Sequence, residues 1–193
     1  MQVQKTEIKN KIIEAAVSQF CTKGYKDSSI RTIAQLAGIT PGNIYAYFAN
    51  KNEILSCILE NCVHKIDDYI THLYENEIYT PSLLQNISDM ITDLFLSYKS
   101  EFLILFGNAQ GSKYENIKTQ RINAVAGRIH TGLTLHSSYP HDMLLSEAIS
   151  TAFIEGLIRI MLTCQNDEDR LRKMVDDFTR IIFTVNFDAE EEN

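Results

Sequence analysis

The feature that most constrains the fold is the helical spacing of apolar residues, which continues through nearly all of the 193-residue chain. Between Ile8 and Phe20, for example, apolar residues recur every four positions, which places them on one face of an α-helix. No segment combines a two-residue alternation with the turn signals of a β-hairpin. Proline occurs only at positions 41, 81 and 140, so long segments contain no strong helix breaker. The sequence therefore predicts an all-α fold.

Capping residues and glycines divide the chain into nine expected helices. Gly24 is expected to end the first helix, because glycine takes the left-handed conformation of a helix end at little cost. Asn50 is expected to cap the fourth helix, with Glu53 three residues later in a capping-box arrangement. The expected helices cover residues 6–22, 28–38, 41–48, 51–74, 81–99, 101–107, 114–135, 143–164 and 167–187.

Residues 30–48 have the pattern of a helix-turn-helix. Ala34 is small where a second helix must approach closely, and Gly38 can adopt the positive φ of a helix end. Ile44 is placed to fill the angle between the two helices. Thr40 offers an N-cap oxygen, and Pro41 occupies the first helical position, where its missing N–H is not needed. Such a unit presents its second helix to the major groove of DNA.

The charge distribution agrees with this interpretation. The whole chain carries a net charge of −7, which alone argues against DNA binding. Residues 1–51 nevertheless contain seven lysines and arginines against three acids, whereas residues 52–193 contain eleven against twenty-two. A basic N-terminal end on an acidic remainder concentrates the attraction for phosphate at that end. The alternative is that charge merely varies along the chain.

Several other classes of protein are disfavoured. The chain opens Met-Gln-Val-Gln-Lys without an apolar leader, and its longest apolar stretch, residues 149–162, is broken by Glu155 and Arg159. The four cysteines fit no disulfide or zinc spacing, which predicts reduced thiols in a cytoplasmic protein without metal or cofactor, although a redox-sensing cysteine stays open. Residues 107–113 lack the full order of a phosphate-binding loop. No nucleophile, base and acid can be grouped, so we expect no enzyme.

Residues 8–60 resemble the DNA-binding domain of the TetR family of bacterial transcriptional regulators. The resemblance rests on motifs at residues 20–25, 28–34 and 51–55 and on Ala37-Gly-Ile-Thr-Pro-Gly-Asn-Ile-Tyr-Ala-Tyr-Phe48. It implies an all-α, nine-helix TetR-like architecture. The expected domains are a helix-turn-helix head (residues 1–50), a body for ligand binding and dimerisation (residues 51–187) and an acidic tail (residues 188–193).

The resemblance also implies a set of DNA contacts. Asn43 is best placed to read a base edge, since an amide both donates to and accepts from adenine. Thr40 matches a phosphate-binding helix start, and Lys51 matches a phosphate clamp. Ala46 departs from the family, because many relatives carry a larger side chain there. The implied contacts are Arg31, Thr40, Pro41, Gly42, Asn43, Tyr45, Tyr47 and Lys51, with structural packing as the alternative for the last three.

For the body, the resemblance implies a homodimer and a pocket for a small-molecule effector. The expected dimer interface is formed by the last two helices, with burial inside the chain's own subunit as the alternative. Its candidates are Ile149, Phe153, Gly156, Leu157, Ile160, Cys164, Val175, Phe178 and Ile182. The candidates for the effector pocket, each of which could instead be an ordinary core or surface residue, are His64, Asn86, Met90, Phe95, Phe102, Phe106, Tyr114, Asn123 and Arg128.

The implied function is that of a repressor. It would bind palindromic double-stranded DNA as a homodimer and leave it when an effector binds and moves the fourth helix. An activator, or a regulator without a ligand, stays open. So does a second class, a helical small-molecule-binding or enzymatic protein whose helix-turn-helix is only structural. Salt-dependent DNA binding distinguishes the two classes.

Overall fold

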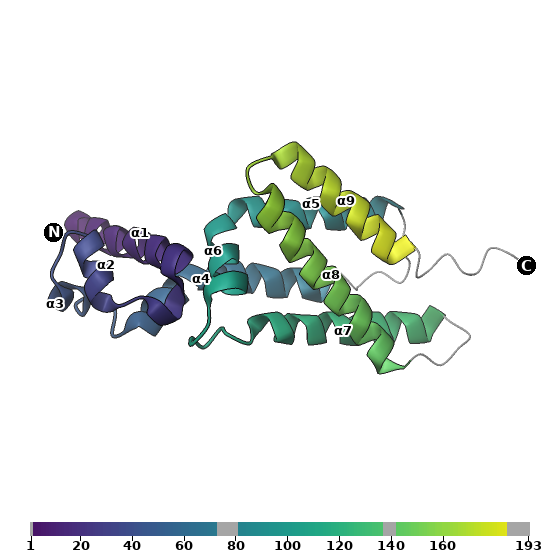
Figure 1. Ribbon diagram of the computed structural model, residues 1–193, viewed down its shortest axis with the longest axis horizontal. Helices are drawn as coiled ribbons and strands as arrows, with labels where there is room; N and C mark the ends of the chain where they lie inside the picture. Colours follow the sequence, from purple (N-terminus) through teal and green to yellow (C-terminus); the bar gives the residue numbers. More distant parts are fainter. Residues whose placement is uncertain (1, 73–80, 137–141, 185–193) are drawn as a thin grey trace, which may run out of the picture. The chain divides into compact units, whose positions relative to one another are not determined.

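The computed structural model describes residues 2–72, 81–136 and 142–184, and within these ranges the regular elements are helices, as predicted (Figure 1). The expected tail at residues 188–193 lies outside the described residues. The elements are α1 (Gln2–Asp27), α2 (Ile30–Leu36), α3 (Pro41–Ile44), α4 (Lys51–His72), α5 (Pro81–Ser97), α6 (Lys99–Leu103), the π-helix η1 (Ile104–Asn108), α7 (Ile117–His136), α8 (Met143–Cys164) and α9 (Glu168–Thr184).

Helix α1 changes direction where the sequence predicts its end. Gly24 has a φ of 79°, which breaks the helical backbone before the last residues of α1. The hydroxyl of Ser28 donates a hydrogen bond of 2.6 Å to the carbonyl oxygen of Gly24 and so satisfies one of the acceptors that the break leaves free.

The segment expected as one helix at residues 101–107 is divided in two. Helix α6 covers its first turn, and a π-helical turn, η1, follows directly. The rings of Phe102 and Phe106 lie 5.3 Å apart, centroid to centroid, across this junction. The amide of Asn108, the last residue of η1, donates to the carbonyl oxygen of Cys21 in α1 at 2.9 Å.

The chain forms two compact units. The first unit comprises Met1–His64 and Tyr98–Lys118, and the second comprises Lys65–Ser97 and Thr119–Asn193. The core of the first unit contains apolar residues of α1 to α4, including the fully buried Ile12, Phe20 and Ile44, and α1 packs against η1. The first unit therefore contains the expected head together with α6, η1 and the start of α4.

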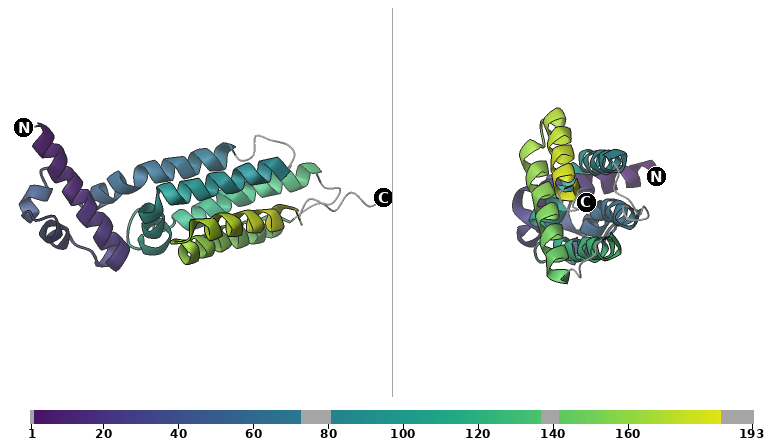
Figure 2. Two further views of the ribbon diagram at one scale, coloured as in Figure 1. Left: turned by 90° about the horizontal axis from the view of Figure 1, so that it is seen from above. Right: turned by 90° about the vertical axis from the view of Figure 1, so that its right-hand side faces the viewer.

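In the second unit, α9 packs beside both α5 and α8 (Figure 2). Arg180 donates to the side-chain oxygen of Gln85 at 2.6 Å, and Arg172 forms an ion pair of 2.9 Å with Asp93. These contacts fix an antiparallel pairing of α5 and α9. Along the described residues, no helix combines the length and the hydropathy that a membrane span requires.

Candidate nucleic-acid interface

Reciprocal capping fixes the first helix of the helix-turn-helix. The hydroxyl of Ser29 accepts from the backbone N–H of Thr32, and the hydroxyl of Thr32 accepts from the N–H of Ser29, both at 3.1 Å. Ile33 and Ala34 are fully buried, so α2 is attached through the face that the sequence predicts. The turn that follows contains Gly38 with a φ of 69°, a left-handed conformation that suits glycine.

The second helix, α3, begins and packs as its sequence predicts. Thr40 is its N-cap, and the threonine hydroxyl accepts from the N–H of Asn43 at 3.4 Å. Pro41 occupies the first turn, and Ile44 is fully buried between the helices. The helix is shorter than expected, because regular α-helix ends at Ile44 and a turn leads to Phe48.

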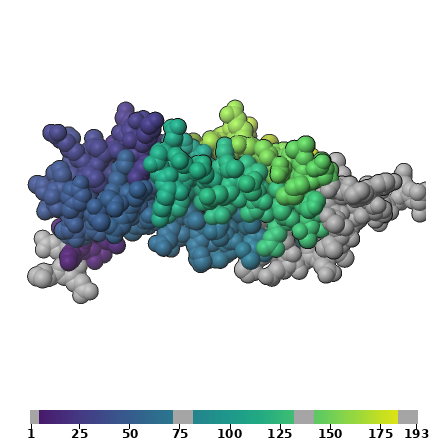
Figure 3. Space-filling view, turned by 90° about the horizontal axis from the view of Figure 1, so that it is seen from below, coloured from purple at the N-terminus to yellow at the C-terminus, as the bar shows by residue number. Residues whose placement is uncertain are grey.

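The outer side of α3 is free to contact a ligand. Tyr45 is 59% exposed, so more than half of its surface is accessible. Leu36 of α2 is an exposed apolar side chain that sequence reasoning missed, with 55% of its surface accessible. The N-terminal residues are purple to blue in the space-filling view of Figure 3. The predicted contacts that are exposed are Arg31, Thr40, Pro41, Gly42, Asn43 and Tyr45, whereas Tyr47 is half-buried.

Lys51 differs from the other predicted contacts, because its ammonium group already has partners. The Lys51 Nζ donates to the carbonyl oxygens of Tyr25 and Ser28, at 2.6 and 2.7 Å. The same atom lies 4.1 Å from the centroid of the Tyr25 ring. Burial lowers the pKa of Lys51, and the charge of Asp27 acts in the opposite direction. Burial also raises the pKa of Tyr25.

The start of α4 is capped largely as predicted. The side-chain oxygen of Asn50 accepts from the N–H of Glu53 at 3.0 Å. The carboxylate of Glu53 accepts from the N–H of Ala49 and not from that of Asn50, so the reciprocal bond is shifted by one residue. These caps hold the end of α3 and the start of α4 in a defined geometry.

The effector candidates do not share one environment. Four of them belong to the first unit and five to the second. Phe95 and Phe102 are buried, and Met90, Phe106 and Tyr114 are half-buried. The exposed candidates, which do not line the interior of either unit, are His64, Asn86, Asn123 and Arg128.

The apolar face of α8 that was assigned to a dimer partner is the face that α8 turns inward. Gly156 lies against Phe178 of α9, so closely that an added Cβ would overlap the phenylalanine ring. Four of the predicted interface residues are instead buried within the chain, where they make intramolecular contacts. They are Phe153, Leu157, Cys164 and Val175. Ile149, Ile160, Phe178 and Ile182 are half-buried.

The second unit contains buried polar groups that sequence reasoning missed. Arg121 forms an ion pair of 2.7 Å with Asp67 of α4, and the Nε atom of Arg121 is buried without a hydrogen-bond partner among the described residues. The hydroxyl groups of Ser146 and Thr179 are also buried without a hydrogen-bond partner among the described residues. Nothing in a single sequence separates such residues from ordinary helix positions.

Comparison with known proteins agrees with the geometry of the head. Residues 12–57 match the model of the family described as bacterial regulatory proteins, tetR family. The chain is 28% identical over 188 residues to the HTH-type transcriptional regulator TtgR of Pseudomonas putida, covering 86% of this chain and 85% of that protein. It is also 28% identical over 87 residues to IcaR of Staphylococcus epidermidis, a negative transcriptional regulator of a biofilm operon, covering 45% and 47% of the two chains.

Solved structures share the fold. The transcriptional regulator FadR from Bacillus subtilis, in complex with stearoyl-CoA, superposes with a TM-score of 0.62 at 21% identity, covering 89% of this chain and 96% of that one. The all-helical fold and the exposed recognition helix define a helix-turn-helix DNA-binding protein. Residues 12–57 of the chain form the helix-turn-helix domain of the TetR family of bacterial transcriptional regulators.

Proposed function

We propose that this regulator is a repressor that binds a palindromic operator as a homodimer and leaves it when a small molecule binds. The observation that carries the proposal is the outer side of α3, where Asn43 and Tyr45 are exposed while Ile44 anchors the helix. Asn43 would read a base edge in the major groove, and Arg31 and the tyrosines would contact phosphate. Repression is supported by the similarity to IcaR, which is a negative transcriptional regulator.

The experiment that tests DNA reading begins with selection of bound fragments from random duplexes. Asn43→Ala should lose about 1–3 kcal/mol of binding free energy on the selected duplex and much less on random DNA, because base contacts carry the specificity. Asn123→Ala, the same change at an exposed position of α7, is the matched control and should bind as the wild type does. Equal losses on both duplexes would contradict base reading by Asn43.

The homodimer would use the outward sides of α8 and α9. Leu145 and the small residues Ala148 and Ala152 are exposed on α8, and Met174 and Ile181 are 39% and 61% exposed on α9. An exposed apolar surface of this kind suits a self-complementary contact around a two-fold axis. Such a dimer would place two α3 helices in successive major grooves, about 34 Å apart.

Sedimentation tests this surface. Ala152→Arg should give monomers, because a long charged side chain would enter the helix contact. Thr151→Arg alters the neighbouring exposed residue, which lies about 100° around the helix, and should stay dimeric. Dimers of Ala152→Arg would exclude this surface.

The effector would bind in the second unit, near the buried polar groups that have no hydrogen-bond partner among the described residues. A buried Nε of Arg121 without a hydrogen bond is costly unless a ligand or water satisfies it. Stearoyl-CoA, the ligand in the B. subtilis FadR complex, is the first probe to use. If it is the effector, it should raise the melting temperature of the wild type, raise that of Arg121→Met much less, and release the wild type from its operator.

A further inference from the structure

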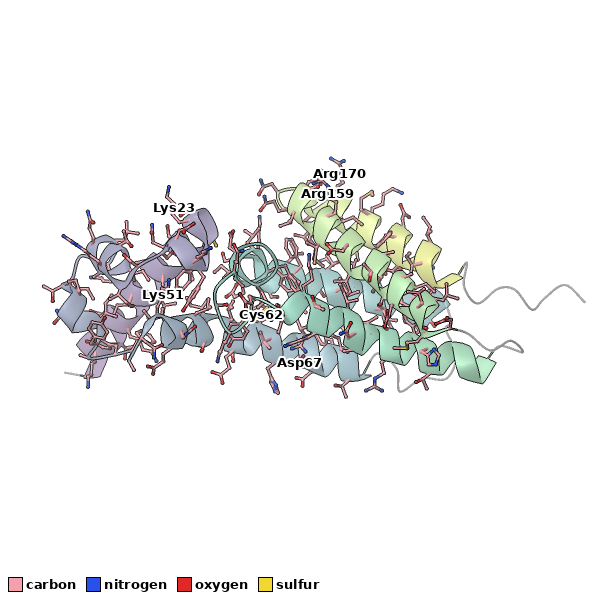
Figure 4. The ribbon with its side chains drawn as sticks, turned by 60° about the horizontal axis from the view of Figure 1, so that its bottom comes forward. Lys23, Lys51, Cys62, Asp67, Arg159 and Arg170 are labelled. Atoms are coloured by element: carbon pink, nitrogen blue, oxygen red, sulfur yellow. The ribbon has the colours of Figure 1, made fainter. Side chains whose placement is uncertain are left out.

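The turn between α1 and α2 leaves backbone carbonyl oxygens that no helix satisfies. The last turn of any α-helix has such acceptors, and here the carbonyl groups of Tyr25 and Ser28 lie on the two sides of the turn. Lys51, the first residue of α4, is labelled in Figure 4. Its Nζ atom donates to both carbonyl oxygens, at 2.6 and 2.7 Å. The backbone N–H of Ser28 also donates to the carbonyl oxygen of Tyr25, at 3.3 Å, so Lys51 adds a second attachment to the turn from a position 23 residues further along the chain.

The ammonium group also contacts the Tyr25 ring. An ammonium group has three N–H donors, of which two point to the carbonyl oxygens. The face of the Tyr25 ring lies 4.1 Å from Nζ, a distance at which the ring attracts a cation. The Tyr25 hydroxyl donates to the side-chain oxygen of Asn52 at 2.8 Å, so the next residue of α4 fixes the ring in place.

We propose that Lys51 is a positioning residue of the DNA-binding head, and that it does not bind phosphate. Its ammonium group attaches the α1–α2 turn to the first turn of α4. Ser28, one of its partners, directly precedes Ser29, the N-cap of α2, so the orientation of the helix-turn-helix depends on this contact. The proposal rests on the DNA reading proposed above, since the position matters only if the head binds a duplex.

The experiment compares three variants on the selected duplex over a range of salt concentrations. Each phosphate contact contributes about 0.9 to the slope of log K against log salt concentration. Lys51→Met should lower the affinity by the same factor at every salt concentration, leave the slope unchanged and lower the melting temperature by about 5 °C. Arg31→Met is the matched control for an exposed cation and should reduce the slope by about one without a change in melting temperature.

Lys51→Arg provides a second, independent result. A guanidinium group binds phosphate at least as well as an ammonium group, but its planar shape does not fit two carbonyl oxygens and a ring face arranged around one point. We therefore expect Lys51→Arg to lower the melting temperature while retaining the salt slope. A phosphate clamp would instead tolerate this change.

The outcomes separate this proposal from the proposed function. A slope reduced by about one in Lys51→Met, or an unchanged melting temperature in both Lys51 variants, would overturn the positioning role. If the wild type bound no duplex at low salt, the proposed function would fail. The melting temperatures of the Lys51 and Arg31 variants would then still decide whether Lys51 holds the turn.

Discussion

Two cysteines on α4 have opposite surroundings. Cys57 is exposed, whereas Cys62 is fully buried, and burial together with the charge of Glu101 raises the pKa of Cys62 to about 12. Because the thiolate is the reactive form, only a thiol that ionises near neutral pH and is exposed reacts quickly. The environment of Cys62 therefore argues against a redox-sensing role for that residue.

This contrast predicts a labelling pattern. Iodoacetamide at pH 8 should modify Cys57 in the native protein and leave Cys62 unmodified until the chain unfolds, as read by peptide mass spectrometry. The Cys57→Ser variant, which keeps the half-buried Cys21 and the buried Cys62 and Cys164, should be labelled much more slowly over the same period. Rapid native labelling of Cys62 would show that the middle of α4 opens readily.

Gly42 offers a second prediction at a single residue. A Cβ added at Gly42 would meet only the hydroxyl oxygen of Thr40, at 3.9 Å, and the glycine does not have a positive φ. The free protein therefore has room for an alanine. Gly42→Ala should leave the melting temperature unchanged or slightly raised, because alanine is the better helix former.

If the backbone of α3 approaches the duplex at Gly42, the same variant should lose about 1–3 kcal/mol of binding free energy on the selected duplex. Fluorescence anisotropy measures that loss. Unchanged affinity would mean that the duplex does not approach this part of α3.

The close packing of α8 and α9 requires a glycine that the sequence analysis assigned to the dimer interface. An added side chain at Gly156 would overlap the Phe178 ring, whose centroid lies 6.0 Å from that of Phe153. Gly127 of α7 has no atom within 4 Å of the equivalent position. The two helical glycines can therefore be compared directly, because one is crowded by a neighbouring helix and the other is not.

We expect Gly156→Leu to lower the free energy of unfolding by about 1–3 kcal/mol through overpacking. Gly127→Leu should be neutral or stabilising by about 0.5–1 kcal/mol, because glycine is a poor residue inside a helix. Urea unfolding at one fixed protein concentration measures both changes. Equal effects of the two variants would contradict the close approach at Gly156.

Local chemistry made some elements predictable from the sequence and left others open. The caps Ser29 and Thr40 and the plug Ile44 act within a few residues of one another, so their pattern identified α2 and α3. Helix α8 was found with the same bounds, but its apolar residues occur on several sides, including the exposed Leu144. Periodicity could therefore not identify the buried side of α8.

Contacts between residues that are far apart in the sequence could not be predicted, for a different reason. Lys51 was interpreted as a phosphate contact because its partners lie 23 and 26 residues away, where no spacing rule applies. The ion pair of Arg121 with Asp67 spans a still longer separation. Such roles depend on the tertiary arrangement, which only the structure supplies.

At the scale of the whole molecule, the first unit is assembled from two separate stretches of chain. Residues 98–118 belong to it together with residues 1–64, and Asn108 donates to the carbonyl oxygen of Cys21. A fragment of residues 1–64 would expose the side of α1 that packs against η1. Its head would therefore lack part of its core.

We predict that this fragment unfolds at a lower temperature than the head does within the full chain. Amide hydrogen exchange of α1 provides the comparison, with faster exchange expected in the fragment. In the full chain, Asn108→Ala should accelerate exchange around Cys21 without changing it in α3. Equal protection of α1 in the fragment and the full chain would contradict the prediction.

The two-stretch construction has a consequence for protein engineering. Biosensors are often made by grafting the DNA reader of one regulator onto the sensor of another, with a single junction after the reader. In this chain, one junction near residue 50 would combine an α1 from one parent with an η1 from the other. A chimaera that also transplants residues 98–118 would keep both sides of that contact from the same parent.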